Sequence, residues 1–176
     1  HGGLDFKTGG VIGKPVRALA DGFISRIRVT HGSGYVLDVC YDNGYSTINR
    51  HLSGFISPIA ERVEKLQYEN ENWEVEIIPE PDEYPVKAGQ QIAWSGNTGY
   101  SFGPHLHLDV FETETGDYVD PMPFFKTKIK DTRAPKADGI MFFPQLGKGV
   151  VDGKQENKMI LPNTGRPVEA WGVIGT

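Results

Sequence analysis

Apolar and polar residues alternate most regularly in one short segment of the chain. Leu106, Leu108 and Val110 alternate there with two histidines, His105 and His107. A period of two is typical of a half-buried β-strand. Residues two positions apart share a face of a strand, so both imidazoles project to one side, roughly 6.6 Å apart. The pattern predicts a strand that offers two histidines to a single site.

Short apolar segments separated by glycine and asparagine turns fill the first third of the chain. They predict strands at residues 16–19, 22–30, 34–41 and 45–51. Asn43-Gly44 between two such segments indicates a hairpin, because both residues tolerate positive φ. We therefore expect an antiparallel sheet whose strands form the floor of a groove and whose loops form its walls.

The pattern changes between residues 55 and 85. Ile59, Val63 and Leu66 recur at helical spacing and predict one helix at 58–69, with Ser57 as its N-cap and Pro58 in its first turn. A strand at 73–78 and a proline-rich acidic loop at 79–85 are expected to follow.

The last third of the chain predicts a second, smaller unit. Phe124 and Phe125 are expected to close the first core, and residues 126–135 read as a charged linker. Short strands are predicted at 139–143, 149–151, 158–161 and 167–173. About 50 residues are few for a stable all-β module, so we interpret them as the opening strands of a β-sandwich. The predicted fold is mainly β, with domains at 1–125 and 126–176.

Composition excludes several classes of function. The formal net charge is -5 with no basic run, which argues against a nucleic-acid partner. No apolar stretch approaches the ~20 residues of a membrane helix, and the start does not resemble a signal peptide. The one cysteine, Cys40, excludes a disulfide framework and is expected to be a small buried residue.

The histidines suggest a metal site. There are five, His1, His31, His51, His105 and His107, and zinc sites that do chemistry use three protein ligands with a fourth position left for water. His1 and Asp5 would lie ~13 Å apart in a straight strand, so Gly2 and Gly3 would have to let the backbone fold back for both to bind one ion. A structural zinc would be expected to use cysteine sulfurs, of which the chain has one.

Four motifs follow one another in a characteristic order. They are His1-Gly2-Gly3-Leu4-Asp5, Asn49-Arg50-His51-Leu52, Gly96-Asn97-Thr98-Gly99 and Gly103-Pro104-His105-Leu106-His107-Leu108. Residues 13–18, 43–47 and 86–93 add further matches. In this order and spacing the chain resembles the M23 family of zinc metallopeptidases, the lysostaphin and LytM type, over residues 4–120.

The resemblance implies that His1, Asp5 and His107 bind one zinc ion and that His51 and His105 are catalytic. The sequence alone leaves open how His105 and His107 divide these roles. The resemblance also marks residues 55–85 as an insertion relative to compact members of the family. This insertion either forms a wall of the groove or only packs against the domain. Asn49 and Asp109 depart from the family pattern, and we expect them to affect the shape of the groove.

The implied function is a zinc-dependent endopeptidase that cleaves peptide bonds in bacterial cell-wall peptidoglycan, with stem-peptide cross-links as the expected target. Its expected location is the cell envelope or the outside of the cell. The natural chain is expected to have further residues upstream of His1. Two alternatives remain: a non-catalytic LytM-like module that binds the wall or activates a hydrolase, and a copper oxidase that uses the amine and ring of an N-terminal His1. The oligomeric state is not readable from the sequence.

Overall fold

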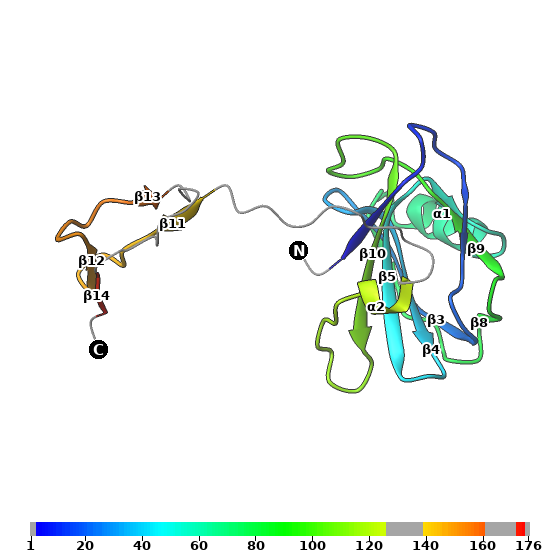
Figure 1. Ribbon diagram of the computed structural model, residues 1–176. Coiled ribbons are helices and arrows are strands. Elements are labelled where there is room, and N and C mark those ends of the chain that lie inside the picture. Colours follow the sequence, from blue (N-terminus) through cyan, green and yellow to red (C-terminus); the bar gives the residue numbers. More distant parts are fainter. Residues whose placement is uncertain (1–2, 126–138, 161–171, 175–176) are drawn as a thin grey trace. The chain divides into compact units, whose positions relative to one another are not determined.

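The chain has two compact units, His1–Ile129 and Lys130–Thr176. The structure is a computed structural model, and it describes residues 3–125, 139–160 and 172–174 (Figure 1). The predicted linker at 126–135 and the predicted domain boundary after residue 125 fall on residues 126–138, outside the described part, so both stay predictions.

A seven-stranded antiparallel sheet dominates the first unit. Its strand order is β1-β10-β5-β4-β3-β7, with β8 also paired to β3, and Figure 1 shows β10, β5 and β4 side by side. The strands are β1 Leu4–Lys7, β3 Gly22–Thr30, β4 Gly34–Tyr41, β5 Tyr45–Leu52, β7 Val75–Ile77, β8 Pro85–Val86 and β10 His105–Glu112. The predicted antiparallel hairpins at 22–30, 34–41 and 45–51 are confirmed.

A second, three-stranded sheet and the helix α1 (Ile59–Glu69) complete the first unit. The sheet has the order β2-β9-β6, with β2 Pro15–Arg17, β9 Gln91–Trp94 and β6 Gly54–Phe55. The main hydrophobic core draws on both sheets and the helix, with Val16, Ile27, Leu37, Leu52, Phe55, Ile59 and Ile92 among its members. The fold is mainly β, with antiparallel sheets and a short helix, as predicted.

The two faces of the large sheet have different chemistry. On β4, Leu37 and Val39 join the core, whereas Asp38 between them pairs with Arg28. Alternation along a strand puts successive side chains on opposite faces. The face opposite the core therefore carries polar side chains, and the paired strands β1, β10 and β5 extend this polar face to Asp5, His107 and their neighbours.

The Arg28–Asp38 pair is largely buried. Nη2 of Arg28 donates to both carboxylate oxygens at 2.7 and 2.8 Å, and the side chains are only 18% and 9% exposed. Burial raises the pKa of Asp38 above its ordinary value, although the hydrogen bonds from Arg28 act in the opposite direction. Desolvation therefore has the largest effect on the pKa of Asp38, and the charged carboxylate depends on Arg28 for its stabilisation.

Arg28→Met is expected to lower the free energy of unfolding at neutral pH by about 3–5 kcal/mol, because it leaves Asp38 buried without a counter-charge. The folded-state pKa of Asp38 then rises further above its unfolded value. The loss of unfolding free energy is complete at pH values above the folded-state pKa of Asp38, and it disappears as the pH falls toward the unfolded-state pKa. Denaturant unfolding at about pH 7 and about pH 4 measures both effects.

Arg26→Met is the matched control, because Arg26 lies two residues away on β3. Its partner is Glu76, and the two side chains are 44% and 50% exposed. An exposed ion pair contributes about 0–1 kcal/mol, so this variant is expected to lose no more than about 1 kcal/mol. Equal losses in the two variants would contradict the role assigned to burial at Asp38.

The segment 55–85 packs onto the first unit. Ile59 and Val63 of α1 are buried, and β7 extends the large sheet by pairing with β3. The helix begins at Ile59, close to its predicted start, but the predicted N-cap is wrong. The Ser57 hydroxyl donates to the carboxylate of Glu61 and does not accept from a backbone N–H of the first turn, so the helix start has no side-chain cap.

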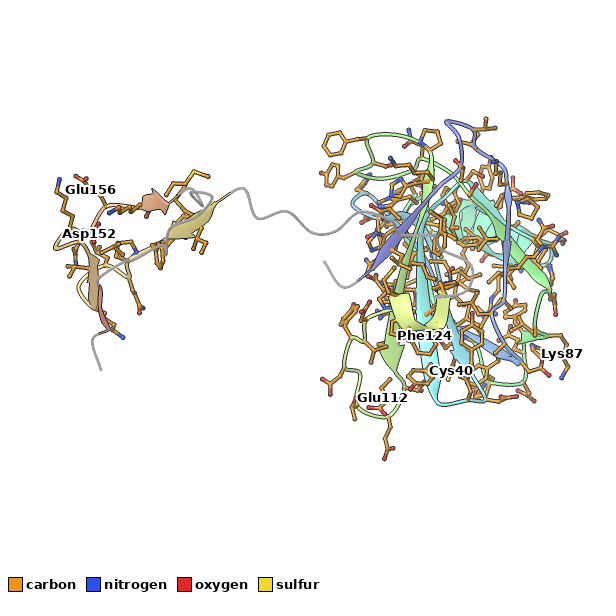
Figure 2. The ribbon with its side chains drawn as sticks, viewed as in Figure 1. Cys40, Lys87, Glu112, Phe124, Asp152 and Glu156 are labelled. Carbon is orange, nitrogen blue, oxygen red and sulfur yellow. The ribbon has the colours of Figure 1, made fainter. Side chains whose placement is uncertain are left out.

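Two predictions about packing at other positions are also wrong. Cys40, labelled in Figure 2, is half-buried rather than buried, and its sulfur lies near Thr113. Phe124, in the short helix α2 (Met122–Phe125), is 49% exposed and contacts the ring of Tyr45. With Phe125 against Phe6, this pair covers strands of the large sheet and does not close the core.

The second unit contains two small antiparallel sheets. In one, β11 (Ile140–Phe142) pairs with β13 (Lys158–Ile160), and in the other, β12 (Gly149–Val151) pairs with β14 (Gly172–Ile174). Part of the predicted strand at 167–173 lies outside the described residues, and the β-sandwich interpretation stays a prediction. Among the described helices of the chain, none is long and apolar enough to cross a membrane.

Candidate metal centre and catalytic cleft

A cleft of about 1030 Å³ lies on the polar face of the large sheet. Its floor comes from β1, β10 and β5, and its walls come from the loop after β1 and the loop before β10. The residues that line it include Gly3, Asp5, Lys7, Arg50, His51, His105, His107 and Asp109. Four of the five histidines and aspartates predicted for the site therefore share one cleft.

Strand register brings three of the predicted site residues together. Asp5 on β1 is directly opposite His107 on β10, and His105 lies two residues before His107 on the same face. Nδ1 of His107 is 2.7 Å from Oδ1 of Asp5, and Nε2 of His105 is 3.7 Å from the same oxygen. The ligand atoms of the three residues all lie within 4.8 Å of one another. His1 lies outside the described residues, so its place in the site stays a prediction.

His51 reaches the cleft through a β-bulge. Between the paired positions 37/49 and 35/52, β4 contributes one residue and β5 contributes two, Arg50 and His51. His51 has φ of 60°, a left-handed conformation that is uncommon for a residue other than glycine. The bulge breaks the period of two, so both side chains line the cleft. A regular strand would have placed them on opposite faces.

The ring of His51 is fixed by a backbone carbonyl. Its Nδ1 lies 2.8 Å from the carbonyl oxygen of Thr98, and because a carbonyl only accepts, Nδ1 carries the proton and Nε2 keeps its lone pair. Burial and the neighbouring rings of His105 and His107 lower the pKa of His51, while the Thr98 carbonyl opposes them. His51 is therefore a neutral imidazole at neutral pH, with Nε2 able to accept a proton.

The Gly96–Gly99 motif holds that carbonyl in place. The hydroxyl of Thr98 donates to the carbonyl of Leu52 at 2.6 Å and accepts from the backbone N–H of Tyr35 at 3.0 Å. Gly99 has φ of +73°, and a Cβ there would lie 2.5 Å from backbone atoms of the facing turn. Only glycine allows this approach, so the motif positions His51.

His105 is oriented in the same way. Its Nδ1 lies 2.8 Å from the carbonyl oxygen of Gly103, so Nδ1 carries the proton and Nε2 faces Asp5. The ring centroids of His51 and His105 are 4.9 Å apart. The cleft thus holds two neighbouring imidazoles, each with an Nε2 lone pair that is not committed to the backbone.

His107 has a carboxylate at each ring nitrogen. Besides Asp5 at Nδ1, Oδ1 of Asp109 lies 3.0 Å from Nε2. Asp109 is 5% exposed, and its other oxygen accepts from Nε of Arg50 at 2.9 Å. Sequence reasoning missed this role of Asp109. Its position two residues after His107 on one strand face could have indicated it.

This arrangement fits a metal ion. A neutral imidazole has one N–H, so when Nε2 donates to Asp109 the Nδ1 lone pair faces the carboxylate of Asp5. Either a second proton on the ring or a metal ion can join these two facing acceptors, and a carboxylate behind a ligating histidine is a common support for metal binding. Imidazole and carboxylate donors suit zinc.

Gly3 is required by its close approach to His107. A Cβ at this position would lie 2.7 Å from Nε2 of His107 and 2.6 Å from Oδ1 of Asp109. A side chain at position 3 would therefore force the ring of His107 or the carboxylate of Asp109 to shift. This gives a physical reason for one of the two glycines in the first motif.

Asp109→Asn is expected to weaken zinc binding by about 10-fold to 100-fold, because the amide removes the negative charge that supports His107. Competition with a chelating dye measures this affinity. The matched control is Asp117→Asn, which changes an exposed carboxylate and is expected to bind zinc like the wild type. Equal affinity in all three proteins would show that Asp109 has no role in metal binding.

His31 and the insertion at 55–85 do not line the cleft. His31 is in the turn before β4, and its ring stacks on Trp73 with 5.1 Å between the ring centroids. In the described part of the chain, the lining of the cleft includes no residue from 55–85. With Val63 and Val75 buried in the core, the structure favours the packing role for this insertion.

Known proteins resemble the chain in both sequence and fold. The glycyl-glycine endopeptidase ALE-1 of Staphylococcus capitis is 35% identical over 133 residues, which are 72% of this chain and 29% of that protein. The DD-carboxypeptidase/endopeptidase Mpg of Neisseria meningitidis is 30% identical over 137 residues, 78% of this chain and 25% of that protein. The chain thus spans less than a third of the length of these curated relatives.

A solved structure matches the fold of the first unit. The catalytic domain of lysostaphin from Staphylococcus simulans aligns with a TM-score of 0.51 and 31% identity, covering 72% of this chain and 79% of that domain. No family model matches the chain. The match to lysostaphin nevertheless covers most of its catalytic domain, and it is supported by both sequence identity and fold. We conclude that the chain belongs to the M23 family of peptidases, of the lysostaphin type.

Proposed function

We propose that this protein is a zinc-dependent endopeptidase that cleaves peptide bonds in bacterial peptidoglycan. The observation that supports it best is the meeting of Asp5, His105 and His107 with His51 in one open cleft. In this proposal His1, Asp5 and His107 hold the zinc ion. Three protein ligands leave a fourth position for water, which is the composition of a working site rather than a structural one.

A zinc ion bound there supplies Lewis acidity for the scissile carbonyl and lowers the pKa of a coordinated water to about 7. The chain's own residues handle the protons. Nε2 of His51, neutral because its pKa is lowered, accepts a proton from the attacking water. Nε2 of His105, on the other side of the same space, also carries a lone pair, and once it has taken up a proton it can donate to the charge that develops on the carbonyl oxygen.

The backbone contacts of these histidines contribute by orienting them before substrate binds. Because Thr98 and Gly103 fix the Nδ1 atoms, both rings present Nε2 to the reacting atoms without a search of rotamers or tautomers. Preorganised groups of this kind avoid reorganisation at the moment of reaction.

The substrate of this proposal is a peptide of the cell wall, and the bond is that of a stem-peptide cross-link. The relatives are named for two different bonds: ALE-1 for glycyl-glycine and Mpg for a DD-bond. The chain spans only part of each of these relatives, so cleavage of either bond by this protein is a proposal. A place in the cell envelope or outside the cell follows from a wall substrate.

Digestion of purified cell walls tests the proposal. Walls with glycine bridges and walls with direct cross-links are incubated with the protein, with and without a chelator, and the fragments are identified by mass spectrometry. We expect metal-dependent release of peptides cut at cross-links. Protein that retains no zinc after gentle purification, cuts neither wall and still binds peptidoglycan would instead show a non-catalytic wall-binding module.

A further inference from the structure

The cleft contains a lysine that the proposed mechanism does not use. Its charged side chains are Asp5, Lys7, Arg50 and Asp109. Arg50 pairs with Asp109 at 2.9 Å, and Asp5 contacts the two histidines of β10. Among the described residues, no carboxylate lies within ion-pair distance of Lys7. One cation of the cleft therefore has no counter-charge within the described part of the chain.

The backbone at Lys7 is firmly placed. Lys7 is directly opposite His105 and two residues after Asp5, so its side chain starts on the face of the sheet that carries the site. The next residue, Thr8, is 6% exposed, and its hydroxyl lies 2.6 Å from the carbonyl of Val11 and 3.1 Å from that of Pro104. These contacts join the two walls of the cleft. The side chain of Lys7 therefore begins beside His105, at this end of the cleft.

A cation in this position opposes the binding of a metal ion nearby. Like charges repel, and Lys7, although exposed to solvent, starts on the same face of β1 as Asp5, directly opposite His105. An anion bound beside the metal site would remove the conflict, because it would pair with the ammonium and leave the metal ligands unchanged. The anion available in a peptide substrate is a carboxylate.

We propose that Lys7 binds a free carboxylate of the substrate peptide close to the cleaved bond. This inference rests on the proposed function and specifies its substrate class. Such a lysine would favour stem peptides that carry a free carboxylate next to the cross-link, whereas a bridge made only of glycine offers no such group. Lys7 is then a specificity-determining residue, and it takes no part in the chemical step.

Two synthetic cross-linked peptides that differ only in this group test the proposal: one has the free carboxylate and the other a carboxamide. We expect wild-type protein to cleave the carboxylate peptide with a kcat/KM about threefold to tenfold higher, as for a charge-assisted contact on a partly solvated surface. Lys7→Met is expected to cleave both peptides equally, with the loss in KM, and Lys7→Arg to keep the preference.

Lys14→Met is the matched control, because Lys14 is exposed and does not line the cleft. Lysine on an edge strand such as β1 also discourages strand pairing, and that role would give Lys7→Met and Lys14→Met the same peptide preference as the wild type. This result would overturn the inference while leaving cleavage itself intact.

Binding of the two peptides to His51→Ala protein, with and without Lys7→Met, separates failure of the inference from failure of the proposed function. A carboxylate preference that disappears with Lys7→Met supports the inference even if the wild type cleaves neither peptide. Equal binding of both peptides to both proteins contradicts it.

Discussion

His51→Ala is expected to reduce kcat/KM on a cross-linked peptide by about 100-fold to 10,000-fold while the protein keeps its zinc. The substitution removes the imidazole whose Nε2 is left free by the Thr98 hydrogen bond, and general acid–base groups contribute rate factors of this size. His51 does not belong to the group of converging ligand atoms. Steady-state kinetics and metal analysis of the same preparation measure both parts of the prediction.

His51→Gly separates loss of chemistry from loss of folding. The left-handed backbone at position 51 is unfavourable for alanine and easily adopted by glycine, so the glycine variant is expected to be at least as stable as the alanine variant. Both lack the imidazole and should be equally inactive. If the glycine variant regained wild-type turnover, His51 would have only a structural role.

His107→Ala is expected to lower zinc affinity by more than about 100-fold and to abolish cleavage. This change removes a predicted ligand directly, and even residues that only support a ligand affect affinity by about 10-fold to 100-fold. It also leaves Asp109 buried beside Arg50 without its second partner. Competition with a chelator at fixed pH gives the affinity, because histidine must be deprotonated to bind metal.

His105→Ala decides how the two histidines of β10 share the work. If His107 is the ligand and His105 is catalytic, the His105 variant keeps zinc and loses turnover. The matched control is His31→Ala, which removes an imidazole that stacks on Trp73 outside the cleft, and it should keep both. Loss of zinc in the His105 variant, with zinc kept in the His107 variant, would reverse the assignment.

Local sequence patterns predicted most of the strands and the direction of the site residues. The alternation at His105 and His107 is a local property, and both rings do face one cleft. One error arose where packing against a distant residue decides: Phe124 looked apolar enough for the core but lies against Tyr45 at the sheet surface. The error at Ser57 has a local cause, because its hydroxyl donates to the carboxylate of Glu61 and does not cap the helix.

The resemblance to a family named the candidate site residues, but it did not explain why they work together. Asp109 was expected only to alter the shape of the groove. In the structure it supports His107 and is held by Arg50. This connection runs from β5 to β10, and no pattern within either segment contains it.

By itself, the sequence determined the antiparallel β-segments, the order of the histidine and glycine motifs, and the exclusion of a disulfide framework, because these depend on neighbouring residues or on composition. Tertiary structure alone decided three things: the register that sets Asp5 opposite His107, the bulge that turns His51 into the cleft, and the contact between Asp109 and His107. The reason is physical. Strand register and bulges are set by hydrogen bonds between segments far apart in the chain, so the site exists only after those strands have paired.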